Sequence, residues 1–199
     1  MHELVKLTAR EAVERLRAGQ ITPVELVDAT AERIAEVEPV VNALSTLAVE
    51  RARAHAERLM QTGHPADPPA GYLYGLPVAI KDLKDVAGVR STKGSPIYAS
   101  HIPERSDYLV GNIESKGGLV LAKSNTPEFG AGANTFNEVF GKTRNPWDTR
   151  LTCGGSSGGT AVALATGQIW LGSGSDLGGS LRIPASFCSV VGLRPSPGR

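Results

Sequence analysis

The sequence lacks the features that mark several large classes of protein. Two cysteines among 199 residues are too few for a disulfide scaffold, and the four histidines show no metal-ligand spacing with them. The 21 lysines and arginines are balanced by 20 acidic residues, and this net charge of +1 excludes the basic surface typical of nucleic-acid binders and of polybasic membrane segments. Hydrophobic residues at 41% and charged residues at 21% exclude disorder for most of the chain.

Long hydrophobic runs are also missing. The first residues contain no cationic stretch followed by an apolar core, so we expect no secretory signal and a cytoplasmic location. Residues 151–175 carry no charged side chain, but their longest apolar run, Ala161–Ala165, is far shorter than the ~20 residues that a membrane span requires. This segment is rich in glycine, serine and threonine. We therefore expect tightly turned, buried backbone there, and we look for functional residues in it.

Helix start signals dominate residues 1–62. The first two predicted helices each begin with a threonine and a glutamate three residues apart, the spacing of a capping box: Thr8 with Glu11, and Thr22 with Glu25. The second helix is expected to end near Pro39, and a third to run from about Ser45 to Met60. We interpret this region as helices packed on a larger body.

After a loop rich in proline and glycine, the pattern alternates between strands and helices. The expected elements are a strand at 76–80, a helix at 106–116, a strand at 119–122, a helix at 161–166 and a strand starting at 169. Such alternation indicates an α/β domain with at least some parallel pairing. Lys81 and Asp82 follow the first strand, and because successive strand side chains point to opposite faces, Asp82 is expected to point away from Lys81.

Two nucleotide-binding motifs are imitated but incomplete. Val78–Lys81 matches the strand that holds the ATP-binding lysine of protein kinases, but the glycine-rich loop before it and the kinase motifs after it are absent. Gly141–Thr143 ends like a phosphate-binding loop, but Phe136 stands where that loop needs glycine. Neither motif supports a nucleotide-binding function.

Gly155–Gly159 formally satisfies the nucleophile elbow of α/β-hydrolases, with Ser157 as the attacking residue. Such an elbow connects a strand to a helix, but the preceding residues 145–154 do not have a strand pattern. The hydrolase triad also needs a histidine after the serine, and the sequence has none after His101. This alternative stays open only if that histidine lies outside these residues.

A second glycine and serine run, Gly174–Ala185, follows the first, Gly154–Gly159, and a lysine strand, Gly75–Asp82, precedes both. Together these three segments resemble the signature of the amidase signature family, in the order that the family has them. Residues 123–129 and 145–148 are similar to its intermediate landmarks. The resemblance covers the whole chain.

The resemblance implies a Ser-Ser-Lys catalytic unit. Ser180 would be the nucleophile, Ser156 the bridging serine after a cis peptide bond, and Lys81 the base. The residue types suit that chemistry, since a serine hydroxyl needs a neighbouring base and a lysine is a base only when it is neutral. Because the ordinary pKa of lysine is near 10.4, burial at the end of a strand must lower the pKa of Lys81 by roughly 3 units.

Other residues of the second run would support this unit. The backbone N–H groups of residues 177–180 would form the oxyanion hole: Leu177, Gly178, Gly179 and Ser180. Asp176 and Ser157 are expected to orient the active residues, and Ser175 stands where the family often has threonine. Arg182 is either an ion-pair partner of another residue or a contact for an acidic group of the substrate. We expect both cysteines, Cys153 and Cys188, to be packed thiols.

These observations together predict an α/β fold with a mixed sheet flanked by helices, incomplete in this chain. Residues 1–62 would be a helical region, and residues 72–199 the N-terminal part of the amidase catalytic domain. The function would be hydrolysis of a carboxamide C–N bond without metal or cofactor. The alternatives are a glutamine amidotransferase subunit that supplies ammonia, which would imply partner subunits and tRNA, and a catalytically incompetent fragment.

The expected partners are a small-molecule amide and either a second copy of the chain or a missing C-terminal portion, with no direct contact to nucleic acid or membrane. Family members are more than twice as long as this chain, so we expect exposed strand edges and apolar surface where the rest of the domain would pack.

Overall fold

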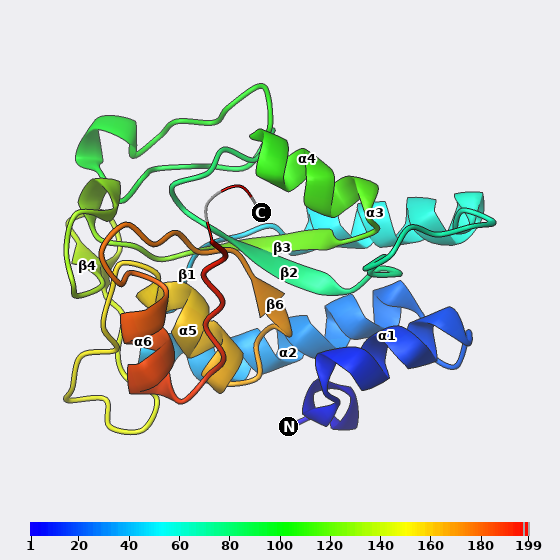
Figure 1. The fold of residues 1–199 in the computed structure, drawn as a ribbon, viewed down its shortest axis with the longest axis horizontal. Helices are drawn as coiled ribbons and strands as arrows, with labels where there is room; N and C mark the ends of the chain where they lie inside the picture. Colours follow the sequence, from blue (N-terminus) through cyan, green and yellow to red (C-terminus); the bar gives the residue numbers. More distant parts are fainter. Residues whose placement is uncertain (197, 199) are drawn as a thin grey trace.

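The computed structural model describes residues 1–196 and residue 198. The α-helices are α1 (Ala9–Arg17), α2 (Pro23–Val41), α3 (Val49–Thr62), α4 (Tyr108–Ser115), α5 (Gly158–Ala165) and α6 (Arg182–Cys188). The strands are β1 (Leu44–Leu47), β2 (Pro77–Lys81), β3 (Leu119–Ser124), β4 (Phe136–Asn137), β5 (Gly141–Lys142) and β6 (Leu171–Gly172). Short 3-10 helices lie at Glu3–Lys6, Pro96–Tyr98 and Glu128–Gly130. Figure 1 shows their arrangement.

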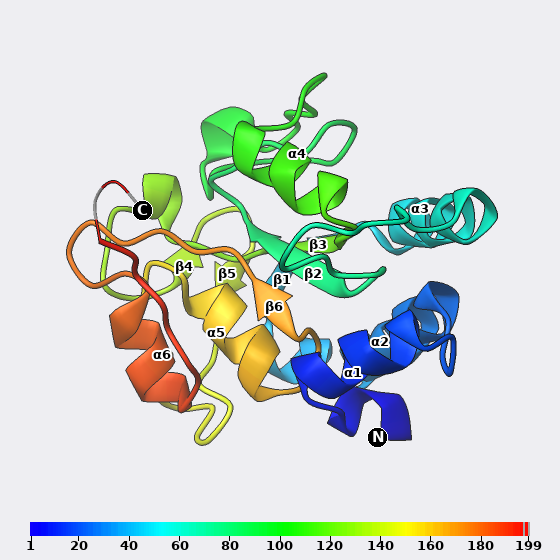
Figure 2. The same cartoon turned by 45° about the vertical axis from the view of Figure 1, so that its right-hand side comes forward.

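Four strands form the central sheet in the order β1-β3-β2-β6. The pairing of β2 with β3 and with β6 is parallel, whereas β1 is antiparallel to β3, so the predicted mixed α/β architecture is confirmed. Every residue of β2 and β3 is buried, as expected for strands covered on both faces. Figure 2 shows α4 on one side of the sheet and α1, α2 and α5 on the other.

A bulge in the β2–β3 ladder decides which side chains share a face. Val78 pairs with Val120, but the next residue, Ala79, pairs with Ala122, so that Leu121 is the extra residue. Leu121 and Ala122 both pack into the core beneath α2 and α5, where Ala79 also lies. After the bulge, each side chain of β3 therefore points to the face opposite to the one it would have without the extra residue.

The first two helices begin as predicted. Both capping boxes form, at Thr8 and at Thr22. Helix α2 ends close to Pro39 as expected, but it runs two residues past the proline to Val41 and stops at Asn42, whose backbone is left-handed with φ 51°. A proline already has a helical φ and removes only one hydrogen bond, so packing on the core carries α2 past it.

The third predicted helix is shorter than expected. Residues Leu44–Leu47 form the edge strand β1 and α3 begins at Val49, so the start near Ser45 is wrong. Pairing with β3 provides hydrogen bonds that a local helix-favouring composition cannot foresee. The loop between α3 and β2 then reaches the central sheet.

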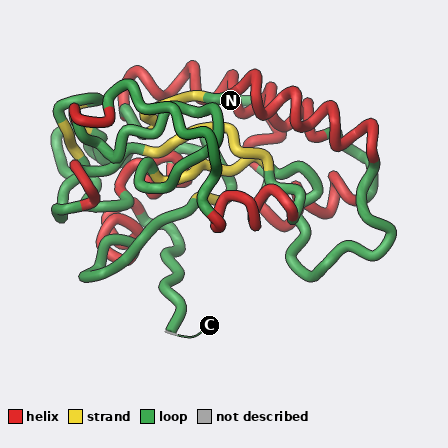
Figure 3. The backbone as a smooth tube through the Cα atoms, turned by 90° about the horizontal axis from the view of Figure 1, so that it is seen from above, coloured by secondary structure: helices red, strands yellow, loops and turns green. Residues whose placement is uncertain are grey.

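Among the described residues, β1 pairs with β3 alone and β6 with β2 alone, so the four-stranded sheet has two edge strands and is not closed. In β6, which is one of these edge strands, Leu171 is 44% exposed. Leu177 at 99%, Val191 at 92% and Leu193 at 78% add further apolar surface to the C-terminal third of the chain. Figure 3 shows helices along one long side of the molecule, and loops over much of the rest. Among the described residues, no helix is both long and apolar enough to cross a membrane.

Candidate active site

The predicted lysine and three serines meet at the end of the central strand β2. Lys81 is the last residue of β2 and is 1% exposed, and Ser156 and Ser157, just before α5, are 2% exposed. Ser175 lies in the loop that follows β6. Because β2 and β6 are parallel, their carboxyl ends lie at the same edge of the sheet, and the Lys81 backbone N–H donates to Ser173 Oγ at 2.9 Å.

The Lys81 side-chain amine has three hydroxyl neighbours. Its Nζ lies 2.7 Å from Ser156 Oγ, 2.9 Å from Ser157 Oγ and 2.9 Å from Ser175 Oγ. Burial lowers the pKa of Lys81 to about 7, against the opposing effect of the Asp176 carboxylate. A substantial fraction of Lys81 is therefore neutral near pH 7, as a general base requires.

The hydrogen bonds of Ser157 restrict what the lysine lone pair can contact. Ser157 Oγ donates to the Ser175 carbonyl at 3.3 Å and accepts the Ser175 N–H at 3.2 Å. Its proton is already engaged, so toward Lys81 it acts as an acceptor. A neutral amine has two N–H donors and one lone pair, and the lone pair is left for Ser156 or Ser175. This is also evidence against Ser157 as the nucleophile of a hydrolase elbow.

The backbone around Ser156 is held by close approaches that exclude larger residues. The Gly155–Ser156 peptide bond is cis, as the resemblance predicted. A Cβ on Gly155 would lie 2.8 Å from the Asn134 backbone nitrogen, and one on Gly159 would lie 2.3 Å from that of Asn125. Glycine at these positions lets the serine loop pack directly on neighbouring backbone.

Ser180 lies near this cluster through its backbone. Its carbonyl accepts the Ser157 N–H at 3.0 Å. Within the part of the chain that the structure describes, no hydrogen bond joins Ser180 Oγ to Ser156 or Lys81. Of the predicted chain of three groups, the structure contains the Lys81–Ser156 contact, and the contact between the two serines is not formed.

Asp176 organises the loop that carries Ser180. Its side chain is 1% exposed and accepts hydrogen bonds from Gly179 N–H at 2.8 Å, Leu181 N–H at 3.1 Å and Arg182 Nε at 3.0 Å. The Arg182 guanidinium, followed by these N–H donors, holds the pKa of Asp176 well below its usual range. In this structure Arg182 is therefore an ion-pair partner of Asp176.

This network affects the predicted oxyanion hole. The Gly179 N–H points to Asp176 and is not free for an oxyanion. The N–H groups of Leu177, Gly178 and Ser180 have no hydrogen-bond partner among the described residues. Leu177 is 99% exposed and Gly178 is also exposed, so this part of the loop borders solvent.

Sequence reasoning missed a second buried lysine on the other face of the sheet. Lys123 Nζ contacts Asp82 Oδ1 at 2.7 Å and Ser91 Oγ at 2.8 Å, and the Lys123 and Asp82 side chains are 0% and 1% exposed. Asp82 also accepts from Thr92 Oγ1 at 2.7 Å. Asp82 thus points away from Lys81, as expected. The expected orientation of Asp82 could have indicated a buried cation such as Lys123, because a carboxylate on a buried face needs a cation there.

The remaining predicted residues have packing roles. Cys153 and Cys188 are free and fully buried, and burial raises their pKa values to about 11 and about 12. Such thiols are protonated at neutral pH and are poor nucleophiles.

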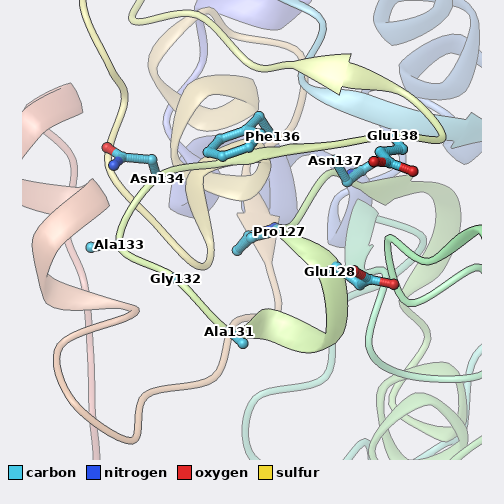
Figure 4. Close-up of a pocket in the computed structure, with 9 residues that line it drawn as sticks. All are labelled: Pro127, Glu128, Ala131, Gly132, Ala133, Asn134, Phe136, Asn137 and Glu138. Carbon is cyan, nitrogen blue, oxygen red and sulfur yellow. The ribbon is translucent and has the colours of Figure 1, made fainter.

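A cavity of about 330 Å³ lies along the loop 127–138, which also passes the serine cluster. A Cβ on Gly130 of this loop would lie 3.6 Å from Ser156 Oγ. Figure 4 shows Glu128 and Glu138 at one end of the cavity, and Ser95 Oγ donates to Glu128 at 2.6 Å. The loop is thus one candidate wall for a substrate near Ser156.

Known proteins resemble this chain over nearly its whole length. The Amidase family model matches residues 25–199. A glutamyl-tRNA(Gln) amidotransferase subunit from Carboxydothermus hydrogenoformans is 41% identical over 200 residues, covering 98% of this chain and 40% of that protein. The protein of that name from a Roseiflexus species is 41% identical over 199 residues, covering 100% of this chain and 40% of the relative. The chain thus spans about 40% of the length of these relatives.

A solved structure, 6-aminohexanoate cyclic dimer hydrolase, superposes with a TM-score of 0.84 at 32% identity, covering 94% of this chain and 37% of that one.

Proposed function

The chain belongs to the amidase family, and from this premise we propose that it cleaves a carboxamide C–N bond through a serine acyl-enzyme. Ser180 is the nucleophile, Ser156 the bridging serine and Lys81 the base. The N–H groups of residues 177–180 stabilise the oxyanion, which requires the Gly179 N–H to leave Asp176 when substrate binds.

The observation that carries the proposal is the contact between Lys81 Nζ and Ser156 Oγ at 2.7 Å in a site where Lys81 is 1% exposed. Among the residues that the structure describes, the hydrogen-bond partners of Lys81 Nζ are hydroxyls, and no carboxylate forms a salt bridge with it to keep it charged. Burial therefore prepares it to accept a proton, and Ser156 is the hydroxyl that can pass one to it.

The proposed chemistry moves one proton back and forth. Ser180 Oγ attacks the amide carbon while its proton passes to Ser156 Oγ, and the proton of Ser156 passes to Lys81 Nζ. Collapse of the tetrahedral intermediate breaks the C–N bond, and the proton returns through Ser156 to the leaving nitrogen. Water then repeats the sequence on the ester, releasing the carboxylic acid and Ser180. Ser157 and Asp176 orient this machinery.

A second candidate is ammonia supply from glutamine to a partner protein. It is favoured by the 41% identity to glutamyl-tRNA(Gln) amidotransferase subunits of two bacteria. The same acyl-enzyme would form on the glutamine side chain, and the released ammonia would be transferred to the partner. Amide specificity distinguishes the two, because this candidate requires glutamine to be the preferred substrate.

The proposal is tested by measuring ammonia release from simple amides and from glutamine. Ser180→Ala, Ser156→Ala and Lys81→Ala should each abolish turnover, whereas Ser115→Ala on α4 should not. Loss of activity in Ser157→Ala with retention in Ser180→Ala would favour the elbow mechanism instead. Absence of turnover by this chain and by a longer form that matches the full length of the relatives would refute the enzyme function.

The proposal also covers the location and the partners of the protein. We place the protein in the cytoplasm, acting on a small-molecule amide without direct contact to nucleic acid or membrane. Its partner is a second copy or the C-terminal portion that longer relatives carry, which would cover the open edge at β6.

A further inference from the structure

A second cavity, of about 540 Å³, lies outside the serine and lysine cluster. It is bounded by β5 with the residues after it, by residues 134–136 and by the loop 149–152. Three cationic side chains line it, namely Lys142, Arg144 and Arg150. Within the described residues, no aspartate or glutamate lines it.

The positive charge of this cavity is only partly compensated. Arg150 forms a fork with Asp148, whose Oδ2 lies 2.7 Å from Arg150 Nη2. Arg144 donates to the Thr149 carbonyl at 3.3 Å, a contact that positions its guanidinium without neutralising it. Across the described ranges 1–196 and 198, neither Arg144 nor Lys142 forms a salt bridge. Two cations thus face one hollow without a counter-charge, and an anion between them would be favoured by both.

Apolar side chains stand beside these cations. Phe136 is 56% exposed and Leu151 is 60% exposed, and both line the same cavity. Exposed aromatic and aliphatic surface in a hollow gains free energy when it is covered by an apolar group. A ligand that carries only charge would leave this surface in water.

We propose that this cavity binds a small-molecule oxyanion, either a phosphate monoester or a carboxylate, attached to a flat apolar body. The oxyanion lies between Lys142 and Arg144, where a guanidinium fork can donate two parallel hydrogen bonds to it. The apolar body lies against Phe136 and Leu151. The proposal does not depend on the amide-cleaving function.

One wall of the cavity continues into the serine loop. Thr152 Oγ1 donates to Asn134 Oδ1 at 2.7 Å and accepts the Gly154 N–H at 3.1 Å, while Lys81 and Ser156 do not line the cavity. The binding site is therefore a neighbour of the proposed active site. Binding can be measured in the Ser156→Ala protein, in which the proposed amidase chemistry is absent.

The test is a titration by NMR chemical shift with phenyl phosphate, benzoate, inorganic phosphate and the uncharged benzyl alcohol. We expect saturable binding of phenyl phosphate or benzoate with a Kd on the order of 1 mM, tighter than for inorganic phosphate, and none for benzyl alcohol. Whichever of phenyl phosphate and benzoate binds more tightly identifies the source of the oxyanion. Binding should weaken as salt is added.

Variants show whether the ligand occupies this cavity. Arg144→Gln and Lys142→Gln should each weaken binding roughly fivefold, and Arg144→Lys, which retains the charge but loses the fork, should weaken it less. The matched control is Arg105→Gln, which removes an exposed positive charge that does not line the cavity.

Melting curves establish that each variant is folded, and the lysine variant of Arg144 serves if the glutamine variant is not. Two results would overturn the proposal: no saturation by either aromatic anion up to about 10 mM, or equal affinities in the wild type and in the Arg144 and Lys142 variants. Equal binding of inorganic phosphate and phenyl phosphate would overturn the role of Phe136 and Leu151.

Discussion

Lys81 at the end of β2 and Lys123 near the end of β3 are both almost fully buried, at 1% and 0% exposure, but their surroundings differ. Lys123 contacts a carboxylate, Asp82, at 2.7 Å, whereas the hydrogen-bond partners of Lys81 Nζ are three serine hydroxyls. Burial lowers the pKa of both amines, and Asp82 opposes that effect at Lys123. The strands are adjacent, so the difference arises from which face each side chain enters.

The two lysines therefore differ in the chemistry that their surroundings allow. The buried ion pair holds the loop 82–92 on the sheet, and the Asp82 carboxylate favours the charged form of Lys123. A lysine among hydroxyls can lose its proton and pass it along oxygen atoms. The same residue type, at the same depth, thus has a carboxylate partner on one face and hydroxyl partners on the other, and we propose a catalytic role only for the second.

Lys81→Met keeps the side-chain volume and removes the proposed base. We expect amide hydrolysis to fall by up to roughly 10⁴-fold, the upper range for a general base. The folded state should persist, because within the described residues no carboxylate forms a salt bridge with Lys81. Ammonia release and a melting curve measure the two effects, with the exposed Lys6→Met as control. Activity within tenfold of wild type would show that Lys81 is not the base.

Lys123→Met should give the reverse pattern. It leaves Asp82 buried without its cation, which costs about 3–5 kcal/mol of unfolding free energy. Denaturation in urea measures this loss, and the double variant Lys123→Met with Asp82→Leu should recover most of it, since an apolar pair avoids the burial of charge. A single variant as stable as wild type would mean that the pair contributes nothing.

The pH dependence of stability should reveal the lowered pKa of Lys81. The pKa of Lys81 falls from its ordinary 10.5 to about 7 on folding, so between these values the unfolded chain binds one more proton than the folded chain. Stability attributable to Lys81 therefore rises with pH, by roughly 2 kcal/mol from pH 7 to pH 9. Unfolding of wild type and Lys81→Met at several pH values isolates this slope, and parallel curves would contradict it. Above pH 9 the thiols, with raised pKa values, oppose the trend.

The smallest expected effect is that of Ser175→Ala. It removes one of the three hydroxyls around Lys81 Nζ without touching the contact with Ser156. Losing one hydrogen bond to the amine should reduce activity about tenfold or less and shift the acid limb of the pH–rate profile. Ser175→Thr, which keeps the hydroxyl, should restore both. If the alanine variant matches wild type in rate and profile, Ser175 has no positioning role.

Much of this arrangement could be predicted because it follows from local sequence patterns. Capping boxes at Thr8 and Thr22, the buried strand before Lys81 and the parallel α/β order depend on residues close in sequence. The meeting of Lys81 with Ser156 was predicted from resemblance, because the two residues lie 75 positions apart and no local rule joins them.

The rest depends on tertiary contacts. Strand β1 replaced the start of a predicted helix because β3 offered a partner. The Gly179 N–H donates to the Asp176 carboxylate, which also accepts a hydrogen bond from Arg182. Residue spacing alone does not show whether this N–H binds an oxyanion or the Asp176 carboxylate.

The bulge at Leu121 keeps the two buried lysines apart. If β3 paired with β2 without it, Lys81 would lie opposite Lys123 in place of Ser124, and paired residues of a parallel ladder point to one face. Two buried ammonium groups would then be neighbours, and Asp82 would lose its cation. The extra residue shifts every later position of β3 by one, which sends the second lysine to the face of Asp82. The placement of the two lysines on opposite faces of the sheet thus depends on one leucine, Leu121, which has no partner in the β2–β3 ladder.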